Sequence, residues 1–89
     1  MSEIMFYDVE VYTGWWCVCV SNNEGYKNQF TSEHNNINEL KDIVDTHIMV
    51  GFNNYSYDDI ILQNIISGRD KVTYIKYLSD RIIIHNDKF

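Results

Sequence analysis

The stretch that decides the fold is MFYDVEVY, residues 5–12, in which apolar and aromatic residues surround two carboxylates, Asp8 and Glu10. A run rich in β-branched and aromatic side chains favours a strand, and successive side chains of a strand point to opposite faces of its sheet. Asp8 and Glu10 should therefore share one face, while Tyr7 and Val9 point to the other. Residues two apart on a strand lie about 6.6 Å apart, so the acids are neighbours whose repulsion needs a cation, a donor or solvent to relieve it. The pair fits a solvated sheet face as well as a metal site.

The sequence around this strand predicts a small mixed α/β fold. Gly14 and the stretch 22–25 are typical of turns, so the first three strands should form an antiparallel meander. The apolar spacing then changes to that of a helix, and a helical crossover should place the fourth strand parallel to the first. The expected elements are strands at 4–12, 15–20 and 26–31, a helix from 37, a strand at 47–52, a helix ending near 66, and a helix over 72–80 followed by either a short strand or an extension of that helix at 81–85.

Capping residues mark the ends of the two inner helices. Asn36 is the expected N-cap of the first helix, with Glu39 three residues later as its reciprocal partner. Ser56 and Asp59 have the same spacing before the second helix, and Gly68 stands where a helix C-terminal glycine belongs. These residues mark the start of the first helix and both ends of the second.

Length and composition indicate one soluble globular domain over residues 1–89. Apolar residues make up 45% of the chain and aromatic residues 15%, which suffices for one modest core. The first residues lack the basic and apolar regions of a secretory signal, and no apolar run is long enough to span a membrane. We expect a cytoplasmic protein that makes no membrane contact, located in the host cytoplasm if a phage encodes it.

The charges are segregated along the chain. Residues 1–66 carry ten acids against Lys27 and Lys41, giving −8, whereas the remainder carries five bases against three acids, giving +2. Proteins that bind nucleic acid usually present a basic stripe that neutralises phosphates, and none is visible here. Nucleic-acid binding is therefore only a weak expectation. An acidic body fits a carboxylate metal cluster, a basic protein partner or simple solubility.

Cys17 and Cys19 alternate with Val18 and Val20, so both thiols should point to the same face of the second strand. No second cysteine pair completes a metal site. We interpret them as small reduced core residues in preference to a redox or zinc role.

The stretch GFNNYSYD, residues 51–58, carries a third acid. It ends the fourth strand and begins the next helix, which places Asp58 in the first helical turn, where the helix dipole favours an anion. If the fourth strand lies beside the first, Asp58 should sit over the same sheet edge as Asp8 and Glu10. Three carboxylates from two distant stretches would then converge.

These two stretches resemble the motifs of a known enzyme family. Phe6-Tyr7-Asp8-Val9-Glu10 looks like the first motif of the DEDD, DnaQ-like 3′→5′ exonucleases, and Gly51-Phe52-Asn53 followed by Tyr57-Asp58 looks like their second, in the spacing of family B and phage DNA polymerases. The resemblance covers residues 4 to about 66. It implies a ribonuclease H-like α/β fold.

The resemblance also implies a chemistry, namely phosphodiester hydrolysis by two Mg²⁺ or Mn²⁺ ions. Asp8 would bridge both ions, Glu10 would hold the ion that activates water, and Asp58 would act through water on the leaving-group side. Asn53 and Tyr57 would contact the substrate end. Turn formation is an equally good explanation for Asn53, since asparagine tolerates left-handed backbone geometry.

The chain departs from the family at the third motif, a Tyr or His followed at fixed spacing by Asp on a later helix. Tyr77 precedes Asp80, and His85 precedes Asp87, at the wrong spacings. The fourth carboxylate and the general base are therefore missing, so we expect an exonuclease-like domain that is incomplete at its C-terminal end and inactive alone.

Two functions follow from this expectation. In the first, the chain is an acidic protein-binding module or inhibitor, for example an anti-CRISPR-like mimic of nucleic acid that binds a basic protein or a nuclease complex. In the alternative, it is a fragment or split subunit of a proofreading exonuclease that another chain completes. Trp15, Trp16 and Tyr55 are the expected partner surface, although at least one Trp should face inward. A homodimer is a further expectation, because a truncated domain leaves an apolar face and a strand edge uncovered.

Overall fold

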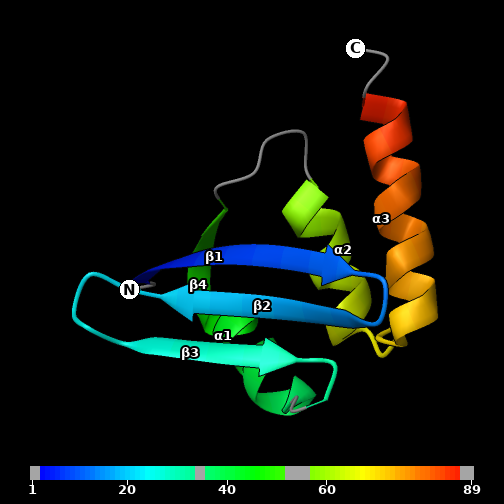
Figure 1. Cartoon of the computed structure of the whole chain (residues 1–89). Helices are drawn as coiled ribbons and strands as arrows, with labels where there is room; N and C mark the ends of the chain where they lie inside the picture. Colours follow the sequence, from blue (N-terminus) through cyan, green and yellow to red (C-terminus); the bar gives the residue numbers. More distant parts are fainter. Residues whose placement is uncertain (1–2, 34–35, 52–56, 87–89) are drawn as a thin grey trace.

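The computed structural model describes residues 3–33, 36–51 and 57–86, and in the last helix it describes side chains as far as Ile82. Four strands and three helices occupy these ranges (Figure 1). In chain order they are β1 (Glu3–Tyr12), β2 (Trp15–Ser21), β3 (Lys27–Thr31), α1 (Ile37–Thr46), β4 (His47–Gly51), α2 (Tyr57–Ile66) and α3 (Val72–Asn86).

The strands form one mixed sheet in the order β3-β2-β1-β4. Strands β1, β2 and β3 are antiparallel neighbours, and β4 runs parallel to β1, so both the predicted meander and the predicted parallel strand are confirmed. Val9 lies opposite Val18 in the β1–β2 register, and Tyr7 lies opposite Gly51 in the β1–β4 register. The parallel pairing is possible because α1 carries the chain back across the sheet and leads directly into β4.

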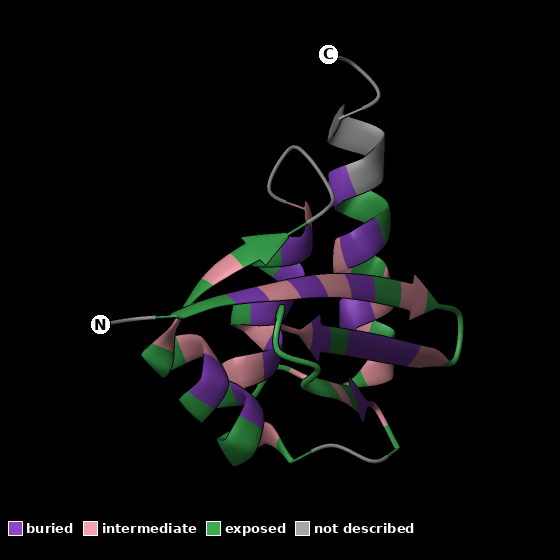
Figure 2. Cartoon of the chain, turned by 90° about the vertical axis from the view of Figure 1, so that its left-hand side faces the viewer, coloured by how far each residue is buried: buried purple, intermediate pink, exposed green. Residues whose placement is uncertain are grey.

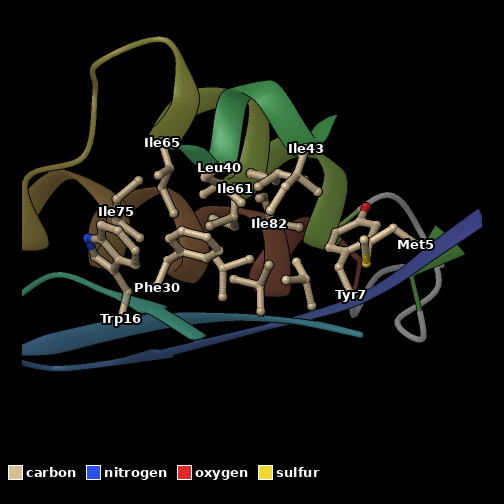
Figure 3. Packing of buried hydrophobic residues seen from close by; sticks show 14 residues of the cluster. Met5, Tyr7, Trp16, Phe30, Leu40, Ile43, Ile61, Ile65, Ile75 and Ile82 are labelled. Atoms are coloured by element: carbon tan, nitrogen blue, oxygen red, sulfur yellow. The ribbon is translucent and has the colours of Figure 1, made fainter. Parts of the chain in front are cut away.

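All three helices pack on the same face of the sheet. Figure 3 shows Met5, Tyr7, Trp16 and Phe30 rising from the strands towards Ile61 and the other apolar residues of the helices. Figure 2 shows the corresponding alternation of buried and less buried residues along β1. The buried core consists of Met5, Tyr7, Val9, Trp16, Val18, Val20, Phe30, Leu40, Ile43, Ile61, Leu62, Ile65, Ile75 and Ile82.

Helix α1 begins at the predicted cap. The side-chain oxygen of Asn36 accepts a hydrogen bond from the backbone N–H of Glu39 at 3.1 Å, while Leu40 and Ile43 are buried against the sheet. The reciprocal half of the predicted capping box is not formed. The Glu39 carboxylate instead accepts a hydrogen bond from the Asn28 side chain at 2.9 Å, because β3 runs close enough to compete for it.

Helix α2 ends in a Schellman motif. Gly68 has a φ of 96°, its N–H donates to Ile65 O at 3.1 Å, and the N–H of Arg69 donates to Asn64 O at 2.9 Å. The predicted C-terminal glycine is thus confirmed, whereas Ser56, the predicted N-terminal cap, lies outside the described residues.

Helix α3 is continuous from Val72 to Asn86, which settles the open alternative for residues 81–85 in favour of an extended helix. Two hydrogen bonds tie it and the turn before it to the rest of the fold. Trp16 Nε1 donates to Asp70 O at 2.7 Å, and the hydroxyls of Tyr57 and Ser79 lie 2.6 Å apart, joining α2 to α3.

Within the described part of the chain, no helix is both long enough and apolar enough to cross a lipid bilayer.

Candidate functional site on the open face of the sheet

Because the described helices all lie on one side, the other side of the sheet is uncovered by any described element. We call it the open face and define it by the residues that alternate with the core positions. They are Ile4, Phe6, Asp8, Glu10 and Tyr12 of β1, Trp15, Cys17, Cys19 and Ser21 of β2, Lys27, Gln29 and Thr31 of β3, and Ile48 and Val50 of β4.

One end of the open face is apolar. Ile4 is paired with Ile48 across the β1–β4 ladder, and Phe6 is paired with Val50. Ile48 is 54% exposed and Ile4 is 48% exposed, and Val50 is also exposed. Large apolar side chains that stay this accessible on neighbouring strands form a patch of the kind found where proteins bind one another.

The middle of the open face forms a shallow groove of about 600 Å³. Asp8 of β1 and Lys27 of β3 bring opposite charges to its lining, and Phe6 contributes an aromatic ring. The remaining lining residues are Tyr7, Cys19, Val20, Ser21, Asn28 and Gln29. The groove therefore combines an apolar floor with a few polar groups, which suits contact with a side chain or a small ligand.

Glu10 and the aromatic residues occupy the far end of the open face. The Tyr12 hydroxyl donates a hydrogen bond to the Glu10 carboxylate, and this bond together with the charge of Glu10 raises the pKa of Tyr12. The Tyr12 ring stacks on Trp15 with the ring centroids 5.6 Å apart. Trp15 is half-buried here, so its place on the predicted partner surface is compatible with the structure.

Trp16 requires a correction to the predicted partner surface. Its side chain is fully buried in the core, because its position in β2 points towards the helices, and it therefore contributes nothing to an exposed surface. It fulfils the expectation that one of the two tryptophans faces inward. Tyr55 of the predicted partner surface lies outside the described residues.

Asp58 lies on the helix side of the sheet. It occupies the first turn of α2, as predicted, but is only 1% exposed. Its charge acts on Tyr7, a core-facing residue of β1. The pKa of Tyr7 is raised to about 12, mainly by burial, then by the charge of Asp59 and then by the charge of Asp58.

The expected convergence of the three acids is therefore not seen. Asp8 and Glu10 project from the open face, whereas Asp58 is enclosed beside Tyr7 on the covered side. Among the described residues, no three His, Cys, Asp or Glu side chains lie close enough together to hold a metal ion. The set of Asp8, Glu10 and Asp58 does not fit two Mg²⁺ or Mn²⁺ ions in this arrangement, and a metal role for any of them stays a prediction.

The two predicted substrate contacts have separate outcomes. Asn53 lies outside the described residues. The Tyr57 hydroxyl is engaged with Ser79, and burial is the main reason why the pKa of Tyr57 is raised. A contact of Tyr57 with substrate stays a prediction.

The sequence did contain a signal for the apolar end of the open face. In HIMVG, residues 47–51, Ile48 and Val50 alternate with Met49, and a parallel neighbour for β1 aligns them with Ile4 and Phe6. A strand apolar on both faces is typical of a fully covered sheet. For this reason the sequence alone did not indicate that the apolar end of the open face is exposed.

Comparison of the chain with protein-family models, with curated proteins and with solved structures gave no match.

Proposed function

We propose that the chain is a protein-binding module that uses the open face of its sheet to dock a basic partner. The observation that carries the proposal is the exposed apolar patch of Ile4, Ile48 and Val50 beside the groove that contains Asp8. The apolar patch supplies contact area, and the acids of the open face favour a positively charged partner.

Charge supports a basic occupant. The chain has a net charge of −6, and Asp8 and Glu10 on β1 outnumber Lys27 on β3 among the charged residues of the open face. A partner that carries lysine or arginine next to apolar side chains would match this pattern, and its association would be steered by long-range attraction. A nucleic acid would be repelled by the same charge.

The edge strand β4 supports an extended segment as the partner's contact element. Within the described sheet, β4 pairs only with β1, so its outer backbone groups face away from the ladder. Its sequence HIMVG lacks the lysines, glutamates and prolines that usually protect an edge strand. A strand added to this edge would extend the open face while its alternate side chains reach the apolar patch.

The fold proposed here is a ribonuclease H-like sheet. The strand order β3-β2-β1-β4, with only β4 parallel to β1, supports it. In this proposal the scaffold is kept while hydrolytic chemistry is absent, because the carboxylates are divided between the two faces of the sheet.

Selection from a phage-displayed library of random peptides tests the docking proposal without a known partner. We expect enriched peptides to combine apolar and basic residues and to lose at least tenfold in affinity for the Ile48→Lys variant, because a buried unpaired charge would replace an apolar contact. Tyr77→Lys on α3 is the matched control, since Tyr77 is 56% exposed against 54% for Ile48. Peptides that bind both variants equally, or that are acidic, would contradict the proposal.

A second copy of the chain is the competing occupant, and light scattering over a concentration series separates the two cases. A wild-type dimer that Ile48→Lys converts to a monomer would assign the open face to self-association. Digestion of labelled single-stranded DNA with Mg²⁺ or Mn²⁺, lost on Asp8→Asn, would instead favour the exonuclease.

A further inference from the structure

Two thiols lie side by side on the open face. Cys17 Sγ and Cys19 Sγ are 3.4 Å apart, and both cysteines are free of disulfides. Cys17 is only 2% exposed, whereas Cys19 is exposed. Cys17 is therefore buried, as interpreted from the sequence, whereas Cys19 is exposed and lies outside the core, and both are on the side of β2 that faces away from the helices.

The polar neighbours give the two sulfurs different properties. Gln29 Nε2 on β3 donates a hydrogen bond to Cys17 Sγ at 2.9 Å. The pKa of Cys19 is raised to about 11. Burial is the main cause, followed by the hydrogen bond to Cys17 and by the charges of Cys17, Asp8 and Glu10. With Cys19 as the donor of the thiol pair, Cys17 accepts two hydrogen bonds. The Cys19 thiolate is therefore a minor species at neutral pH, and Cys17 Sγ is held between two donors.

We propose that Cys17 and Cys19 form a redox-active dithiol that low-molecular-weight disulfides, such as glutathione disulfide, convert into an intramolecular disulfide. The thiolate of exposed Cys19 first attacks one sulfur of glutathione disulfide. The S–S bond of the reagent breaks, and one glutathione leaves, taking up the proton that Cys19 released. Cys19 is then joined to the second glutathione by a mixed disulfide.

The second step takes place within the chain. The Cys17 thiolate attacks Cys19 Sγ, the mixed disulfide breaks, and the second glutathione leaves with the proton from Cys17. Two protein thiols are oxidised, and one glutathione disulfide is reduced to two glutathione molecules, so atoms and electrons balance. Gln29 acts as a positioning residue, because its N–H stabilises the thiolate that makes this attack.

The backbone geometry allows the ring to close. Residues two apart on a strand have Cα atoms about 6.6 Å apart, which lies inside the range of roughly 4.4–6.8 Å found for disulfides. The two sulfur atoms are 3.4 Å apart and have to approach to about 2.05 Å to form the bond. This chemistry does not rest on the proposed docking function, although closure would reshape the groove that Cys19 lines.

Mass spectrometry of the full chain tests the proposal. The reduced protein is incubated with glutathione disulfide, the remaining thiols are blocked with N-ethylmaleimide, and the intact mass is measured. We expect the wild type to lose two hydrogens, to retain no glutathione and to take up no maleimide. Cys17→Ser should instead retain one glutathione on Cys19, and Cys17→Ala provides the same measurement if the serine variant does not fold.

Several outcomes would overturn the proposal. One is a wild type that keeps glutathione on Cys19 as stably as Cys17→Ser does. Another is a lack of reaction in both proteins, and a third is a disulfide-linked dimer in place of the internal bond. A folded Gln29→Ala variant should accumulate the mixed disulfide for several-fold longer than the wild type, and an unchanged time course would remove Gln29 from the mechanism.

The pH profile separates this mechanism from simple exposure of a thiol. The groups that face Cys19 are Cys17 on the same strand, Asp8 and Glu10 on β1, and Lys27 and Gln29, which line the β3 side of the groove or touch Cys17. Because the first step needs the Cys19 thiolate, its rate should keep rising with pH up to about 11, whereas the rate of an ordinary thiol levels off above its pKa of 9.0. Asp8→Asn should speed it several-fold, and an unchanged rate would contradict the electrostatic part of the argument.

Discussion

The absence of a side chain at Gly51 leaves room for Tyr7, a core residue of β1. A Cβ atom on Gly51 would lie 3.1 Å from Tyr7 Cζ and 3.2 Å from its hydroxyl oxygen. The Tyr7 ring is buried, at 5% exposure, and belongs to the core between β1 and the helices (Figure 3). Glycine at this position therefore allows β4 to pair closely with β1.

Gly51→Ala should lower the free energy of unfolding by about 1–2 kcal/mol, because the added methyl group overpacks a filled site. Gly14→Ala is the matched control, since no heavy atom lies within 4 Å of the Cβ it would add. Urea denaturation measures both variants. A Gly51→Ala protein as stable as Gly14→Ala would show that the Tyr7 ring shifts at no cost.

Tyr7 also links stability to alkaline pH. Its pKa is raised from 10.0 to about 12 in the folded protein, so the unfolded chain releases the Tyr7 proton first as the pH increases. The stability contributed by neutral Tyr7 is fully present below pH 10 and is lost as the pH rises towards about 12. Urea unfolding across this range should show a smaller loss for Tyr7→Phe than for the wild type. Equal losses in the two proteins would contradict the assignment.

At the scale of the elements, local signals in the sequence located most helix ends and strands. The alternation in residues 5–12 predicted that Tyr7 and Val9 face the core, and Gly68 predicted the end of α2. The side of the sheet on which α2 packs could not be predicted, because the strands carry apolar residues on both faces. For this reason the position of Asp58 in its helical turn was predictable, whereas its separation from Asp8 and Glu10 was not.

The cap of α1 gives a direct test of one such local signal. Asn36→Ala should reduce the free energy of unfolding by about 1 kcal/mol, because the N–H of Glu39 loses its acceptor. Asn38→Ala is the control, since Asn38 is an exposed residue inside the same helix and alanine is the better helix former. If both variants denature at the same urea concentration, the cap contributes nothing to stability.

At the scale of the whole molecule, the arrangement of three helices on one face has two consequences. It leaves apolar residues of β1 and β4 accessible on the open face, which supports the docking proposal (Figure 2). It also separates the acids, with Asp8 and Glu10 on the open face and Asp58 at 1% exposure on the covered one. The acidic charge was compatible with a metal cluster, a basic partner or simple solubility, and it could not indicate which surface would remain bare.

The central claim is that the sheet divides its acids between two faces and leaves one face for a partner. The most direct measurement is a titration of the protein with Mn²⁺, followed by the broadening of backbone amide signals in NMR spectra. We predict that no saturable binding of Mn²⁺ broadens the amide signals of Asp8, Glu10 and Asp58 together. Saturation of all three at micromolar Mn²⁺, abolished by Asp8→Asn and by Asp58→Asn, would contradict the account.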